Sequence, residues 1–108
     1  MTGSGVGSLG TPWALKSMHD DNAAGAQIVG EEFEINAPAG QTWTVTFADD
    51  GVPFFSANEV TVAGGITING STANQPGTQD MTATAVNPAT GEQISGSVEL
   101  PPLQSSGN

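Results

Sequence analysis

Reactive side chains are few in this sequence of 108 residues, and their spacing offers little chemistry. His19 is the single histidine, and it stands beside Asp20 and Asp21 and two residues after Ser17. A hydrolytic triad needs its members on separate rigid elements, whereas these four lie in one stretch that we expect to be a flexible arm. With no Cys, Tyr or Arg, the chain has little besides backbone amides to stabilise an oxyanion. We therefore expect a protein that is not an enzyme.

Paired carboxylates occur at Asp20-Asp21, Glu31-Glu32 and Asp49-Asp50. Because hard oxygen ligands suit Ca²⁺, one interpretation is a cation site built from the last pair with a distant Asp80 or Glu59. None of these stretches matches the twelve-residue calcium loop with alternating oxygen ligands and a closing Glu. The interpretation that we favour is solvated carboxylates in turns, with no metal and no cofactor.

Apolar side chains in exposed settings are the better candidates for function. Phe54 and Phe55 are adjacent, and neighbours in a strand point to opposite faces, so one ring should leave the core. A loop, the N-terminal segment, another chain or a carbohydrate could then cover that ring. In the N-terminal segment, we expect Leu9, Trp13 and Leu15 to contact a partner, because Trp is enriched at interface hot spots. The alternative is that Trp13 folds back on its own domain.

Composition limits the classes of partner. The formal net charge is −10, with 11 acidic side chains against one basic one, so nucleic acid and anionic membrane surfaces would repel the chain. No run approaches the ~20 apolar residues that span a bilayer, and no signal peptide is visible. We expect protein subunits as partners, with no nucleic acid and no membrane.

The element that these residues surround is a predicted β-hairpin from Met81 to Leu100. Its strands, residues 81–86 and 93–100, alternate apolar and polar side chains on either side of Asn87-Pro88-Ala89-Thr90-Gly91. In this turn Pro88 fixes φ and Gly91 allows a positive φ. One apolar and one hydrated face per strand indicate an antiparallel sheet packed on a single side.

Other short runs follow the same pattern. Residues 42–47 (TWTVTF) form the clearest strand, with Trp43 expected at the centre of the core. A second hairpin is expected around Ala63-Gly64-Gly65, with Val60 and Val62 facing inward. About seven short strands indicate a small antiparallel β-sandwich over residues 27–100, although a small barrel would present a similar sequence. Residues 1–26, with one helical turn from Thr11 to Met18, would form an extended N-terminal arm, and residues 101–108 a C-terminal tail.

The strand-turn-strand sequence of residues 81–100, with its alternating threonines, Asn-Pro-x-x-Gly turn and Gly-Ser-Val return strand, resembles the last hairpin of bacterial and phage immunoglobulin-like domains. It lacks the Cys pair and the Tyr of antibody-type domains. The resemblance implies a non-enzymatic structural protein of a phage virion, a capsid decoration protein held on the major capsid protein lattice by its arm. Such a protein could also associate with itself, for example as a trimer. The alternatives are a tail-associated virion subunit and a carbohydrate- or cell-surface-binding module.

Overall fold

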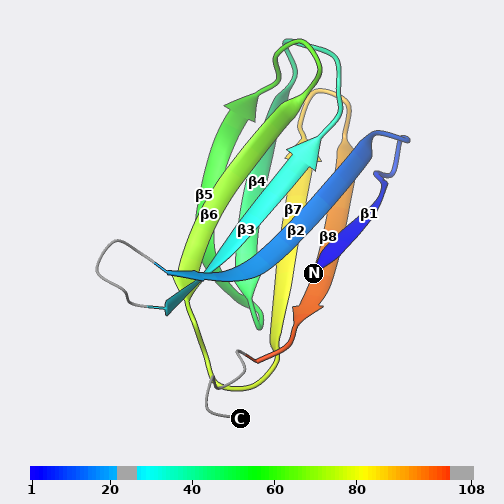
Figure 1. Ribbon diagram of the computed structural model, residues 1–108. Helices are drawn as coiled ribbons and strands as arrows, with labels where there is room; N and C mark the ends of the chain where they lie inside the picture. The colour runs from blue at the N-terminus through cyan, green and yellow to red at the C-terminus, as the bar shows by residue number, and fades with distance from the viewer. Residues whose placement is uncertain (22–26, 103–108) are drawn as a thin grey trace.

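The computed structural model describes residues 1–21 and 27–102, which form two four-stranded antiparallel β-sheets (Figure 1). One sheet contains β1 (Thr2–Val6), β2 (Pro12–Asp21), β3 (Gln27–Ile35) and β6 (Ile66–Ala73), in the order β1-β2-β3-β6. The other contains β4 (Thr42–Asp49), β5 (Val52–Val60), β7 (Gln79–Asn87) and β8 (Glu92–Leu100), in the order β5-β4-β7-β8. The predicted antiparallel β-sandwich is confirmed, with eight strands in the described residues instead of about seven. These residues contain no helix long and apolar enough to cross a membrane.

The first 21 residues belong to the sandwich, so the prediction of an extended arm is wrong for this part of the chain. β1 pairs with β2, and β2 pairs with β3 from Trp13 opposite Ile35 to Asp21 opposite Gln27. The helical turn expected between Thr11 and Met18 is part of this strand. β2 does alternate, because residues 13, 15 and 17 face the core and residues 14, 16 and 18 do not, but small Ala and Ser side chains obscure the pattern. Residues 22–26 of the predicted arm and residues 103–108 of the predicted tail lie outside the described residues.

Trp13 joins the two sheets at their β1 and β8 edges. Its indole lies against Phe33, with ring centroids 6.1 Å apart, and fills a slot between two glycines. A Cβ atom added to Gly96 on β8 would lie 2.6 Å from Cζ3 of this indole, and one added to Gly5 on β1 would lie 3.0 Å from its Cζ2. The absence of side chains at Gly5 and Gly96 therefore makes the room that the indole occupies.

The hairpin predicted for residues 81–100 is confirmed as β7 and β8. The Asn87 carbonyl accepts a hydrogen bond from the Gly91 N–H at 2.7 Å, and the Asn87 side-chain oxygen accepts from the N–H groups of Ala89 and Thr90. Gly91 has φ of 78°, which only glycine adopts readily. One face of each strand is buried, as the alternation predicts: Met81, Ala83, Ala85, Ile94, Gly96, Val98 and Leu100.

The core lies between the sheets and is centred on β3 and β4. Trp43, Val45 and Phe47 of β4 are fully buried, as the alternation of residues 42–47 predicts, and Phe33 packs edge-on against Phe47 at 6.3 Å. A tight turn joins β4 to β5, and Asp50 and Gly51 have the positive φ values of such a hairpin. The predicted position of Trp43 in the core is therefore confirmed.

The second predicted hairpin is wrong, because its two strands lie in different sheets. β5 is the edge of one sheet and β6 the edge of the other, and only the bridge between Val62 and Gly65 closes the connection between them. Val60 and Val62, expected inside, are 55% and 64% exposed. Residues 55, 57 and 59 are the less exposed positions at this end of β5 and Thr61 is buried, so Val60 and Val62 lie on the outward face of the strand and of the connection.

Phe54 and Phe55 both pack on Phe47, whereas strand alternation predicts that one ring leaves the core face. The register between β4 and β5 shifts after Phe47, which pairs with Phe55, while Ala48 pairs with Pro53. This irregularity places Phe54 opposite no residue of β4 and redirects its ring. The ring centroids of Phe54 and Phe55 lie 6.0 and 5.1 Å from that of Phe47, and both side chains are half-buried.

Candidate interaction surface

Four connections meet at one end of the sandwich, the upper end in Figure 1. They are residues 7–11, 36–41, 61–65 and 88–91, and we call them together the loop end. Backbone hydrogen bonds tie Gly40 and Gln41 to Thr61, and Ser8 to Gln93 at the start of β8. The fold therefore holds residues 36–41 against residues 61–65, and residues 7–11 against the start of β8.

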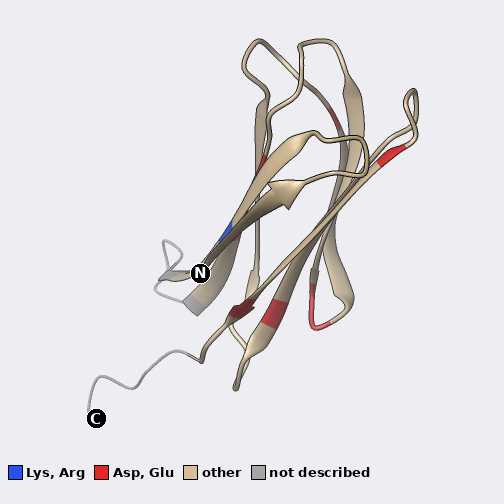
Figure 2. Ribbon diagram, turned by 90° about the vertical axis from the view of Figure 1, so that its right-hand side faces the viewer, with Lys and Arg blue, Asp and Glu red and all other residues tan. Residues whose placement is uncertain are grey.

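None of the residues in these four connections is charged. This is notable in a chain with 11 acidic side chains, of which several lie along the strands and toward the opposite end (Figure 2). Glu34 and Glu59 border the loop end from the strands β3 and β5, and Glu92, which follows residues 88–91, is buried. The surface thus has the layout of a protein interface, with an uncharged centre and a polar rim.

Exposed apolar side chains gather at the same end. Five of the seven large apolar side chains that are exposed in the described residues lie in these connections or within two residues of them: Val6, Leu9, Val60, Val62 and Val86. Leu9 is 65% and Val62 is 64% exposed. The other two, Met1 and Val52, lie away from it. These side chains share one end of the sandwich, and exposed apolar side chains at one end make it a candidate site of protein contact.

Glu92 fixes the connection that carries Leu9. Its Oε2 accepts hydrogen bonds from the backbone N–H groups of Leu9 (3.1 Å) and Thr11 (2.9 Å), and its Oε1 accepts from the Thr11 hydroxyl at 2.5 Å. Burial alone would raise the pKa of this carboxyl, but the hydrogen bonds from Thr11 and Leu9 outweigh it and lower the pKa below the ordinary value. Leu9 is therefore displayed by an anchored loop.

The predicted partner residues have different positions in the structure. Leu9 is exposed at the loop end, as a contact residue would be. Leu15 is 1% exposed and belongs to the core, so it is not available to a partner. Trp13 fills its own slot, which matches the alternative that it folds back on its own domain. Phe54 and Phe55 pack on Phe47 at the β5 edge, away from the loop end.

Of the acidic residues considered as cation ligands, Asp49, Asp50 and Asp80 lie at one end of the sandwich and Glu59 lies at the other. Asp50 accepts a hydrogen bond from the Asp80 N–H at 2.8 Å at the end opposite the loop end, whereas Glu59 borders the loop end. Asp49 is not a solvated turn carboxylate, since it is 8% exposed and its Oδ2 accepts from Gln79 at 2.6 Å. Within the described ranges, no three His, Cys, Asp or Glu side chains form a group that could hold a metal ion.

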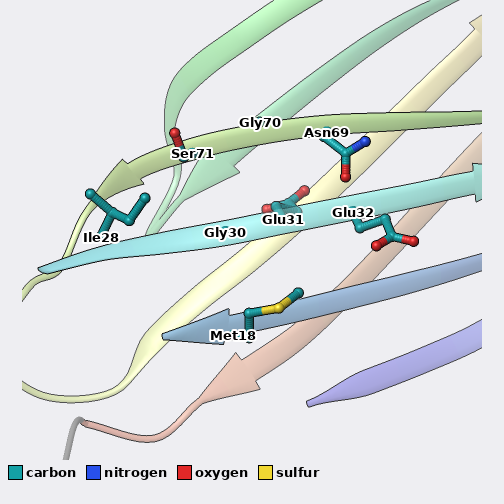
Figure 3. A pocket seen from close by; sticks show the side chains of 8 residues that line it. All are labelled: Met18, Ile28, Gly30, Glu31, Glu32, Asn69, Gly70 and Ser71. Carbon is teal, nitrogen blue, oxygen red and sulfur yellow. The ribbon is translucent and has the colours of Figure 1, made fainter. Parts of the chain in front are cut away.

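His19 and Ser17 are engaged by the fold separately. The Ser17 hydroxyl donates to the Gly30 carbonyl at 3.0 Å, and His19 Nε2 donates to the Pro101 carbonyl at 2.7 Å. A shallow hollow of about 400 Å³ lies nearby on the outer face of β2, β3 and β6, where Gly30 has no side chain (Figure 3). Met18, Glu32, Asn69 and Ser71 surround it. This mixed lining includes no nucleophile beside a base.

Comparison of the chain with protein-family models, with curated proteins and with solved structures finds no match. The geometry of the molecule is therefore the basis for a functional conclusion.

Proposed function

We propose that this chain is a non-enzymatic structural protein of a phage virion, an accessory subunit that decorates the capsid and docks through its loop end. The observation that carries the proposal is the distribution of charge and apolar side chains. The protein has a net charge of −10, yet the four connections at one end contain no charged residue, and Leu9 and Val62 are exposed there. Burial of these side chains would favour association by roughly 25 cal/mol per Å².

The arrangement of strands supports the immunoglobulin-like part of the proposal. β3 pairs with β6 in one sheet, and β4 pairs with β7, which pairs with β8, in the other. This corresponds to the B-E and C-F-G pairings of immunoglobulin domains. A buried Trp on the strand equivalent to C is typical of these domains, and Trp43 on β4 is fully buried. Here Phe33, Phe47 and the aliphatic residues around them fill the core without a disulfide.

The mode of attachment differs from the arm that the sequence predicts. Because β1 and β2 are strands of the sandwich, the contact surface is the end of a folded domain. The molecule measures 49 × 25 × 22 Å, and an end of this cross-section offers roughly 400 Å², about half of the ~800 Å² that each partner buries in a standard interface. One copy would therefore bind weakly, and several copies on a symmetric lattice, such as a trimer, would bind firmly through multivalency.

The structure offers less support for the carbohydrate-binding alternative. That function needs exposed aromatic platforms, but Phe54 and Phe55 are half-buried against Phe47. A tail-associated subunit would use the same loop end, and the two virion positions differ in the particle component that the chain contacts.

The test is cosedimentation of the purified chain with capsids of the encoding phage that were assembled without it. The double variant Leu9→Ser/Val62→Ser should lose at least tenfold in affinity, because each replacement removes an apolar contact worth about 1 kcal/mol or more. Val52→Ser is the matched control, since Val52 is 66% exposed but lies at the start of β5, at the other end of the sandwich. It should bind like the wild type. Failure of the wild type to bind, or equal losses in both variants, would overturn the proposal.

A further inference from the structure

Three carboxylate oxygens are buried between the sheets without a hydrogen-bond partner. They are both oxygens of Glu31, whose side chain is 1% exposed, and Oδ1 of Asp49. Buried polar atoms in proteins are satisfied in the great majority of cases, and a buried carboxylate without a partner is costly. These oxygens therefore need a ligand or a proton.

Glu31 and Asp49 approach each other from opposite sheets. Glu31 lies on β3 and points away from the outer hollow into the space between the sheets (Figure 3), and Asp49 is the last residue of β4. Asp49 is the charged group that acts on Glu31, and burial followed by this like charge raises the pKa of Glu31 to about 8. The cross-strand neighbours of Glu31 offer no donor, because Ser17 donates to Gly30 and Gly70 has no side chain.

A single proton cannot satisfy this arrangement. Shared between the two carboxyls, it would join one oxygen as donor to one as acceptor and leave the third without a partner. A divalent cation would accept all three oxygens as ligands and neutralise both carboxylates at once. The amide of Gln79, which donates to Asp49 at 2.6 Å, holds the remaining Asp49 oxygen in place.

We propose that Glu31 and Asp49 bind one Ca²⁺ ion between the two sheets. The surrounding donors are oxygens, with no Cys in the chain, and hard oxygen ligands select Ca²⁺ over softer metals. An open hollow of about 380 Å³, lined by Asp49, Thr72 and Gln75 among others, lies beside Asp49. It would admit the ion and the waters that complete its coordination. With two carboxylates, the dissociation constant should fall in the range of about 10⁻⁴ to 10⁻³ M.

The experiment is thermal unfolding of the full chain at pH 7.5, after treatment with EDTA, in 10 mM CaCl₂ or 10 mM MgCl₂. We expect Ca²⁺ to raise Tm by roughly 5 to 15 °C relative to Mg²⁺, and calorimetric titration to give one site per chain. Glu31→Gln should abolish the Ca²⁺ response. If that variant does not fold, Asp49→Asn serves the same purpose. Glu99→Gln, an exposed carboxylate on the outer face of β8, is the matched control and should keep the full response.

Equal Tm values in Ca²⁺ and Mg²⁺, with no heat of binding, would overturn the proposal and leave the pair holding a proton alone. A response that Glu31→Gln retains, or that Glu99→Gln loses, would also overturn it, because the stabilisation would then come from the surface charge of the chain.

Discussion

Replacing Gly96 with alanine tests the slot that Trp13 fills between the sheets. The added Cβ would lie 2.6 Å from Cζ3 and 2.7 Å from Cη2 of the Trp13 indole, whereas ordinary contacts begin at 3.4 Å. The indole, or β8 itself, must therefore move by about 0.8 Å or more. Neither moves freely, because Gly5 approaches the same ring from β1 and Phe33 packs against it.

Overpacking of this kind costs about 1 to 3 kcal/mol. For a domain of this size, a loss of about 2 kcal/mol lowers Tm by roughly 10 °C. Trp13→Ala should cost about 3 kcal/mol by itself, toward the lower end for buried Trp because its side chain is half-buried. In the Trp13→Ala background the clash is gone, so Gly96→Ala should then be neutral or slightly stabilising.

The assay is urea unfolding followed by circular dichroism for the wild type, both single variants and the double variant. A coupling free energy of about 1 to 3 kcal/mol between the two positions is expected. Gly30→Ala is the control, because its Cβ would meet nothing closer than Met18 Cγ at 3.9 Å, and it should stay within about 0.5 kcal/mol of the wild type. Additive changes in the free energy of unfolding at positions 13 and 96 would show that Trp13 does not fill a tight slot beside Gly96. A Gly96→Ala variant as stable as the wild type would show the same.

Two other predictions concern the anchored loop and the core. The folded-state pKa of Glu92 is lowered, so its stabilisation is present above the unfolded value of 4.5 and is lost as the pH falls through the folded pKa. Glu92→Gln should cost about 2 kcal/mol at pH 7, and urea titrations should show this deficit shrinking as the pH falls below 4.5. A deficit that does not depend on pH would contradict this role. Trp43→Ala should cost about 3 to 5 kcal/mol, and an unchanged Tm would show that Trp43 is not in the core.

Strands with strict alternation and a recognisable turn could be predicted from the sequence. Residues 42–47 and 81–100 are of this kind, and their inward faces match the structure. β1 and β2 could not be predicted in the same way, since TGSGV contains a single large apolar residue and β2 alternates Trp13, Leu15 and Ser17 with Ala14 and Met18. Their place in the sandwich depends on Gly5, Gly96 and Glu92, which act across as many as 83 residues of sequence. The pattern of neighbouring residues in the sequence does not reveal such long-range contacts.

Part of the loop end could be predicted from the sequence. Its four segments contain no charged residue, but they form one surface only because alternate connections of an antiparallel sandwich meet at the same end. Leu9 was identified as a contact residue for a reason that the fold does not support, namely a free arm. The burial of Glu31 and Asp49 was not predicted, because adjacent acidic residues on strands and turns are usually solvated. A carboxylate at an inward position of β3 was the signal that could have indicated it.

The path of the chain at its two described ends has a practical consequence. Met1 lies beside Leu100 and Pro101 in a common hollow, at the end of β8 away from residues 7–11, 36–41, 61–65 and 88–91 (Figure 1). A second protein joined genetically to either end would therefore extend away from those connections. The domain could carry a fluorescent reporter, an enzyme or an antigen and leave the loop end uncovered, so the proposed docking could be followed through the fused protein.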